Sequence, residues 1–219
     1  MSGHFILTTG KTIDVGTFYC IGKNYSKHAR ELGGEVPDEP VVFIKPPAAY
    51  MQDGAKISLP RFSENIHHEV ELVVVIGENC SGIEPKDASR IVAGYGVGVD
   101  LTLRDIQNKA KNEGHPWAVA KGFYGSAPVS KIVPADKIKE SNPIFDLVLK
   151  VNGVIKQKSN TFEMERSTGE LISYLSAVFT LRAGDCIFTG TPEGVGRLVP
   201  GDKIEAFLGN LVTLNFEVC

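Results

Sequence analysis

The stretch from Glu69 to Ile76, EVELVVVI, decides the fold of this chain. Its consecutive valines are branched at Cβ, and the side-chain rotamers this leaves suit a strand better than a helix. The stretch therefore predicts a buried β-strand. A second apolar run, from Val92 to Leu101, is interrupted by Gly94, Gly96 and Gly98. Glycines inside a strand predict a bulge or the close approach of another backbone segment.

Further strands are predicted on both sides of this pair. The apolar run Val41 to Lys45 ends at Pro46, which cannot continue a strand ladder. Residues Leu147 to Ser159 form a predicted hairpin, because Asn152-Gly153 at its centre is the strongest short turn signal. Near the end of the chain, Val212 to Val218 alternates apolar and polar residues, as a half-buried strand does.

The helices are predicted to be few and short. One begins at Thr102 as N-cap, with Asp105 favourable near the positive end of the helix dipole, and ends at Gly114. Another follows the capping-box pattern Ser167 to Glu170 and runs over Leu171 to Val178. Many strands with few helices predict a β-rich α+β fold rather than alternating βαβ units.

Composition excludes several classes of function. The 219 residues are 42% apolar and carry a net charge of −3, so we expect a folded chain with no basic surface for nucleic acid. No apolar run approaches the roughly 20 residues that span a bilayer, and the start shows no secretion signal. The four cysteines have no metal-site or disulfide spacing, which favours reduced thiols and a cytoplasmic location.

The candidate metal ligands are Glu69, Glu71 and Asp100. Residues two apart on a strand share a face, so Glu69 and Glu71 are expected to point the same way, and Asp100 ends the next apolar run. Three carboxylates without cysteine suit Mg²⁺ or Mn²⁺. The spacing alone also fits the wet face of a half-exposed strand, and His67 or His68 could complete a zinc site instead.

A candidate catalytic pair lies earlier in the chain. His28 and Glu31 are three residues apart on a predicted short helix, where a carboxylate can orient an imidazole that activates water. A solvated polar helix would show the same spacing. Lys121 lies in an apolar stretch, where it either extends to solvent or binds an anion. Arg104 and Gln107 are one helical turn apart and could face the same pocket.

Six short motifs resemble the fumarylacetoacetate hydrolase family, in its short single-domain members. They cover nearly all of the chain from Ile21 onward, and six motifs in the family's order are a specific signal although each alone is weak. They are Gly22-Lys23-Asn24-Tyr25 with His28 and Glu31; Phe43-Ile44-Lys45-Pro46; His68-Glu69 with Glu71-Leu72; Asp100-Leu101-Thr102 with Arg104-Asp105; Lys121 with Phe123; and Thr189-Gly190-Thr191-Pro192 with Gly194-Val195-Gly196.

The resemblance implies a mixed β-sandwich roll and a homodimer. It implies one catalytic domain over residues 1–219, whose first 20 residues are a short N-terminal segment rather than a separate domain. It also implies Mg²⁺ or Mn²⁺ bound at the positions of Glu69, Glu71 and Asp100. The short N-terminal segment favours small acylpyruvates or oxaloacetate over fumarylacetoacetate as substrate.

The same resemblance implies an enzyme that cleaves a C–C bond in a small 2-oxo acid, with acylpyruvate hydrolysis as the first expectation. Decarboxylation or keto–enol tautomerisation of oxaloacetate is the alternative, and a non-catalytic, metal-stabilised binding module is a remote one. The sequence leaves the acyl group, the main activity and the native metal open. The implied roles are water activation by His28 and Glu31, and substrate contacts from Lys121, Gln107 and Thr191, with Arg104 nearby.

Overall fold

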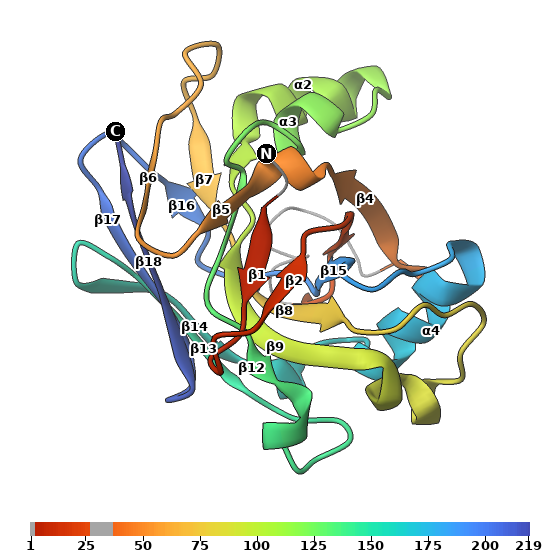
Figure 1. The fold of residues 1–219 in the computed structure, drawn as a ribbon. Helices are drawn as coiled ribbons and strands as arrows, with labels where there is room; N and C mark the ends of the chain where they lie inside the picture. The colour runs from red at the N-terminus through yellow and green to blue at the C-terminus, as the bar shows by residue number, and fades with distance from the viewer. Residues whose placement is uncertain (1–2, 27–36) are drawn as a thin grey trace.

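The computed structural model describes residues 3–26 and 37–219, and strands dominate it (Figure 1). The largest sheet has eight strands and mixes parallel with antiparallel pairs. Its order is β4 (Val41–Lys45), β3 (Phe18–Gly22), β15 (Cys186–Phe188), β8 (Val70–Ile76), β9 (Val92–Val99), β11 (Ala127–Val129) and β5 (Tyr50–Gln52), with β12 (Val133–Pro134) also paired to β9.

A five-stranded sheet packs against this one and contains the predicted hairpin. Its order is β14 (Val154–Asn160), β13 (Asp146–Val151), β17 (Lys203–Leu208), β18 (Val212–Val218) and β6 (Ala55–Ile57). The hairpin turns at Asn152 and Gly153, both with positive φ, as the Asn-Gly pair predicts. Two small sheets complete the strands: β10 (Thr102–Leu103), β7 (Ile66–His68) and β16 (Gly196–Arg197), and β1 (His4–Ile6) with β2 (Thr12–Asp14).

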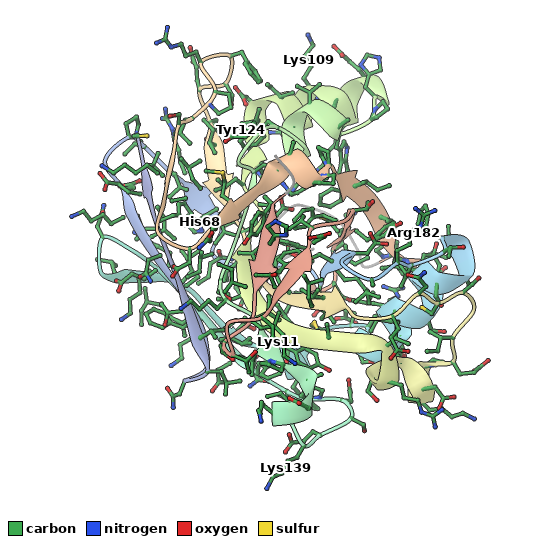
Figure 2. All side chains as sticks on the ribbon, in the orientation of Figure 1. Lys11, His68, Lys109, Tyr124, Lys139 and Arg182 are labelled. Atoms are coloured by element: carbon green, nitrogen blue, oxygen red, sulfur yellow. The ribbon has the colours of Figure 1, made fainter. Side chains whose placement is uncertain are left out.

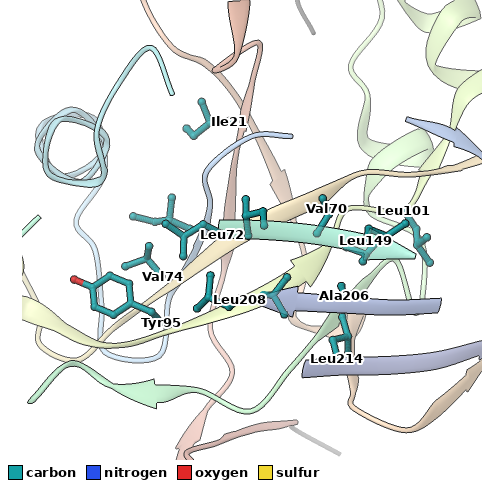
Figure 3. Packing of buried hydrophobic residues seen from close by; sticks show 14 of the residues in the cluster. Ile21, Val70, Leu72, Val74, Tyr95, Leu101, Leu149, Ala206, Leu208 and Leu214 are labelled. Atoms are coloured by element: carbon teal, nitrogen blue, oxygen red, sulfur yellow. The ribbon is translucent and has the colours of Figure 1, made fainter. Parts of the chain in front are cut away.

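Strand β8 is buried on both faces, which explains its nearly continuous apolar sequence. Leu72 and Val74 face the five-stranded sheet and join a large core cluster (Figure 3). Val73 and Val75 face the other way, into a smaller cluster that includes Phe5 from the β1–β2 sheet. The predicted β-rich α+β fold and mixed sandwich are therefore confirmed.

The glycine-interrupted strand β9 shows both features that its sequence predicts. The β8–β9 register shifts between Val75 and Ile76, which leaves an extra residue in β9. At Gly94, a Cβ atom would lie 2.3 Å from the Val133 carbonyl oxygen of β12, which is the close backbone approach. At Gly98, a Cβ atom would lie 2.7 Å from the side-chain atoms Phe188 Cζ and Val73 Cγ2, so only glycine fits without a shift of its neighbours.

The helices lie outside the two large sheets (Figure 1). The capping box of Ser167 and Glu170 is present at the start of α4, as predicted. The prediction that Thr102 is an N-cap is wrong. Thr102 lies in strand β10, where it pairs with His67, and Leu103 is the residue that precedes the helix. Among the described residues, the helices are α2 (Arg104–Glu113), α3 (Ala118–Lys121) and α4 (Thr168–Val178), with 3₁₀ turns at Pro47–Ala49, Pro85–Ile91, Ala135–Lys137 and Thr161–Glu163.

Candidate active site

Three carboxylates meet at one end of the β8–β9 pair. Glu69 lies between β7 and β8, Glu71 within β8, and Asp100 directly after β9. Val70 pairs with Val99, and the Asp100 N–H donates to the Glu69 carbonyl at 2.8 Å, so the two chain segments are held side by side. One oxygen from each carboxylate lies within 4.8 Å of the others, and all three side chains are buried.

Lys121 contacts two of these carboxylates. Its Nζ lies 2.7 Å from Glu69 Oε2 and 2.6 Å from Asp100 Oδ2, and it also donates to the Thr102 hydroxyl at 2.6 Å. Burial lowers the pKa of the Lys121 amine, but the charges of Asp100 and Glu69 outweigh it and hold that pKa above its usual value. The structure therefore places a charged amine against anions rather than at the surface.

Lys45 is a second buried amine at the site, and sequence reasoning gave it no role there. Its side chain is 0% exposed, and Nζ lies 2.8 Å from Asp100 Oδ1. It also donates to the carbonyls of Ser126 at 3.1 Å and Leu101 at 3.4 Å, and to that of Lys121. The only available signal was a lysine ending an apolar strand directly before a proline.

Arg104 and Gln107 contact each other beside Glu69. Arg104 Nη2 donates to Glu69 Oε1, and Arg104 Nη1 donates to Gln107 Oε1 at 2.6 Å. Both side chains are buried and line the same pocket as the carboxylates, as their helical spacing suggested. This arrangement leaves the Gln107 amide nitrogen available to a ligand, since no hydrogen bond from it occurs among residues 3–26 and 37–219.

The pocket has an excess of positive side chains. Lys23, Arg104, Lys111 and Lys121 line it together with the three carboxylates. The remaining lining residues include Phe43, Trp117 and Thr191, and Lys111 Nζ lies 5.1 Å from the centre of the Trp117 ring. Such a surface suits a small anionic substrate once a cation offsets the carboxylates.

Glu71 shows that a divalent cation fits this site. Its carboxylate accepts a hydrogen bond from the Gly190 N–H at 2.7 Å, but it has no ion pair within the described part of the chain. Burial, followed by the charges of Asp100 and Glu69, raises its pKa well above the usual range. A hard cation held by the three carboxylates would remove this repulsion, and oxygen ligands of this kind suit Mg²⁺ or Mn²⁺.

No imidazole belongs to this cluster among the residues that the structure describes. His68 is buried within the fold (Figure 2), and its Nδ1 lies 2.9 Å from Gln157 Oε1. Burial, with a smaller effect of Arg104, lowers the pKa of His67 to about 4. The zinc alternative therefore has no support in the described geometry. His28 and Glu31 lie outside the described residues.

Comparison with known proteins agrees with this geometry. Residues 17–219 match the family model for the fumarylacetoacetate (FAA) hydrolase C-terminal domain. The human protein named oxaloacetate tautomerase FAHD1, mitochondrial, is 44% identical over 199 residues, which are 91% of this chain and 90% of that protein.

Solved structures show the same similarity. A fumarylpyruvate hydrolase from Pseudomonas aeruginosa, solved with Mn²⁺ and pyruvate, is 35% identical with a TM-score of 0.93, over 99% of this chain and 95% of that one. A fumarylacetoacetate hydrolase family protein from Yersinia pestis is 39% identical with a TM-score of 0.93, over 99% of this chain and 100% of that one. The chain therefore belongs to the fumarylacetoacetate hydrolase family.

Proposed function

We propose that this chain is a divalent-metal-dependent enzyme that forms the enolate of a small 2-oxo acid. The observation that carries this proposal is the convergence of three buried carboxylates beside the charged amine of Lys121. Glu69, Glu71 and Asp100 would hold Mg²⁺ or Mn²⁺. A bound ion supplies Lewis acidity that polarises the 2-oxo group.

The side chains around the carboxylates would bind and orient the substrate. Lys121 provides a fixed positive charge where the enolate oxygen develops negative charge. Arg104 and the Gln107 amide can bind the substrate carboxylate, and Thr191 offers a hydroxyl in the same pocket.

Hydrolysis of an acylpyruvate is the first reaction we propose. His28 and Glu31 would remove a proton from a water molecule whose oxygen attacks the acyl carbon, C4. The C3–C4 bond then breaks, C4 leaves as a carboxylic acid, and C3 takes up a proton to give pyruvate. These steps yield pyruvate and one carboxylic acid from one acylpyruvate and one water.

Keto–enol tautomerisation or decarboxylation of oxaloacetate is the second candidate. It is favoured by the 44% identity to a protein named an oxaloacetate tautomerase, which exceeds the 35% identity to the fumarylpyruvate hydrolase. Neither reaction needs an attacking water, since tautomerisation only moves a proton between C3 and the enol oxygen. The charge of Lys121 serves this enolate equally well.

NMR assays of acetylpyruvate, fumarylpyruvate and oxaloacetate with Mg²⁺, Mn²⁺ or EDTA would test the proposal. We expect metal-dependent turnover of at least one substrate and its loss in Glu71→Ala. His28→Ala should slow acylpyruvate hydrolysis by about 10²–10⁴-fold while leaving oxaloacetate tautomerisation in place. Metal-dependent melting without turnover of any 2-oxo acid would favour the non-catalytic binding module and contradict the proposal.

A homodimer, a single catalytic domain over residues 1–219 and a cytoplasmic location belong to the same proposal. The four cysteines are free thiols, which supports a reducing compartment. The human relative is named mitochondrial, so cell fractionation is the direct test of location. Among the described residues, no helix is long and apolar enough to cross a membrane. Sedimentation analysis would test the dimer.

A further inference from the structure

Gln157 is buried in a strand whose apolar residues are exposed. It lies on β14, at the edge of the five-stranded sheet, and is 1% exposed, whereas Val154 and Ile155 on the same strand are 58% and 53% exposed. Burying a polar amide in place of an available apolar side chain costs free energy unless every hydrogen bond is made. A buried polar residue beside exposed apolar residues on one strand indicates that the amide makes specific contacts in the interior.

The amide of Gln157 makes all four hydrogen bonds that it can make. Oε1 accepts from the Val70 N–H at 3.0 Å and from His68 Nδ1 at 2.9 Å. Nε2 donates to Thr191 Oγ1 at 2.9 Å and to the Pro192 carbonyl at 3.0 Å. Because a backbone N–H only donates and a backbone carbonyl only accepts, Val70 and Pro192 fix which end of the amide is oxygen.

The oxygen side of the amide holds the chain on both sides of a candidate metal ligand. At Glu69 the chain leaves the small sheet of β7 and enters the eight-stranded sheet as β8. Gln157 binds the His68 ring before this transition and the Val70 N–H after it. The position of Glu69 therefore depends on a side chain from a different sheet.

The nitrogen side of the amide holds the loop that follows β15. Gly190 in this loop donates to Glu71, and the Thr191 side chain lines the pocket. Since the Thr191 hydroxyl oxygen accepts from Gln157, its hydrogen remains to be donated elsewhere, and the described residues contain no hydrogen bond that it donates. Gln157 thereby sets this hydroxyl as a donor toward the pocket.

The backbone near Gln157 is shaped for this contact. The β13–β14 register shifts beside the Leu149–Gln157 pair and leaves Lys156 as the extra residue of a bulge. The loop approaches this bulge so closely that a Cβ on Gly194, whose φ is +90°, would collide with the Lys156 carbonyl and lie 3.5 Å from Gln157 Cγ. The bulge and the glycine together allow the amide to reach between the sheets.

We propose that Gln157 is a positioning residue that joins the two halves of the active site. Its oxygen fixes the Glu69–Glu71 segment for metal binding, and its nitrogen fixes the Thr191 hydroxyl as a hydrogen-bond donor to the substrate. The role of the nitrogen rests on the proposed function, because it requires an anionic 2-oxo acid in the pocket. The role of the oxygen concerns metal affinity alone.

The variant Gln157→Glu separates the role of the amide oxygen from the role of the amide nitrogen. The variant keeps an oxygen for the Val70 N–H and for His68 but replaces the donor nitrogen with a second acceptor, so the Thr191 hydroxyl turns toward the new carboxylate. In calorimetric titrations with Mg²⁺ present, we expect pyruvate to bind about 10- to 100-fold more weakly, the usual effect of a lost hydrogen bond to an anion. The Mg²⁺ affinity should be no weaker than in the parent. KM for the substrate should rise while kcat changes little.

The variant Gln157→Met removes both the amide oxygen and the amide nitrogen, and so both roles. We expect its Mg²⁺ affinity, measured from the dependence of the melting temperature on Mg²⁺ concentration, to fall about 10- to 100-fold, as for other residues that orient metal ligands. The matched control is Thr161→Val. Thr161 is also buried, and its hydroxyl accepts from the Phe145 N–H at 2.8 Å, but it lies outside the pocket. This control should lose stability without any change in Mg²⁺ or pyruvate affinity.

A double-mutant cycle with Thr191→Val decides whether Gln157 acts through Thr191. In the Thr191→Val background, Gln157→Glu should weaken pyruvate binding no further. Equal weakening in both backgrounds, or parent-like pyruvate and Mg²⁺ affinities in both Gln157 variants, would overturn the proposal. Failure of the parent itself to bind pyruvate would count against the proposed function, whereas the Mg²⁺ titrations would still decide the metal half of the inference.

Discussion

Replacing Lys45 with methionine tests how the buried charges of the site are balanced. Methionine has nearly the length of lysine and no charge, so the packing of the strand end is largely kept. The change removes the amine that lies 2.8 Å from Asp100 Oδ1 and leaves the carbonyls of Ser126 and Leu101 without this donor. Asp100 is 0% exposed, so water cannot replace the lost partner without opening the site.

The expected cost is large in the absence of metal. Removing one member of a buried ion pair costs about 3–5 kcal/mol, because the remaining charge stays buried, and we expect about 4 kcal/mol for Lys45→Met in EDTA. Saturating Mg²⁺ would return positive charge to Asp100. The residual loss should then be about 2 kcal/mol, which corresponds to the unsatisfied carbonyls.

Equilibrium unfolding in urea, with and without Mg²⁺, measures both values. The chain has a single tryptophan, Trp117, which lines the site pocket, so its fluorescence reports unfolding there. The double variant Lys45→Met with Asp100→Asn provides the control. Because it removes both charges, it should be at least about 2 kcal/mol more stable than the sum of the single changes predicts.

This reasoning is refuted if, in EDTA, the unfolding free energy of Lys45→Met lies within about 1 kcal/mol of the parent value, which is the contribution of one neutral hydrogen bond. It is also refuted if Mg²⁺ raises the unfolding free energy by the same amount in parent and variant. Either result would mean that Asp100 is balanced by Lys121 alone, and that the amine of Lys45 serves only its backbone carbonyls.

Four further predictions concern other parts of the molecule. Lys121→Met should lower kcat on a 2-oxo acid by about 10²–10³-fold, while Mg²⁺ still raises the melting temperature; unchanged kcat would exclude its electrostatic role. Ser167→Ala should lower the unfolding free energy by about 1 kcal/mol at neutral pH, measured in urea. Hydrogen bonds from Ser167 lower the pKa of Glu170 below its usual value, so its contribution is present above the unfolded-state pKa and is lost as pH falls through the folded one. The urea midpoints of Glu170→Gln and the parent should therefore differ at neutral pH and become equal in acid. Gly98→Ala should cost about 2 kcal/mol by thermal unfolding, since the new methyl group meets Phe188 at 2.7 Å, and a parent-like melting temperature would contradict this packing.

Local patterns in the sequence predicted the strands and turns well. The strand Val41–Lys45 has the same bounds in the structure, and the hairpin turns at Asn152 and Gly153. The capping box of Ser167 and Glu170 is also present. Each of these signals depends on residues close together in the chain, and so the sequence contains the whole signal.

Thr102 shows where a local rule fails. Threonine before a helical run is a common N-cap, but the Thr102 hydroxyl here contacts the Asp100 carbonyl and the Lys121 amine, and the backbone pairs with His67. Contacts with distant residues override the local preference. The same limit applies to Lys45 and Gln157. The nearest partner of the Lys45 amine along the chain, Asp100, is 55 residues away, and the nearest partner of the Gln157 amide, Thr191, is 34 residues away.

The three carboxylates were predicted as a group from the family resemblance, because their spacing alone also fits the wet face of a half-exposed strand. Glu69 and Glu71 are two residues apart, and Asp100 directly follows β9, the strand paired with β8. What the spacing could not supply is the charge balance, since the lysines that contact these acids come from β4 and α3. The catalytic roles of His28 and Glu31 remain predictions.

The pairing of β8 with β9 has a consequence for how insertions and deletions are tolerated. A slip of one residue between these strands would turn Asp100 to the opposite face of the sheet, away from Glu69 and Glu71. A bound cation thus stabilises only one alignment of the two segments. Metal added during refolding should therefore raise the fraction of molecules that have this alignment. Length changes are accordingly expected in the exposed turn that precedes the η2 segment (Pro85–Ile91) rather than within that segment, where Ala88 and Ile91 are buried in the core.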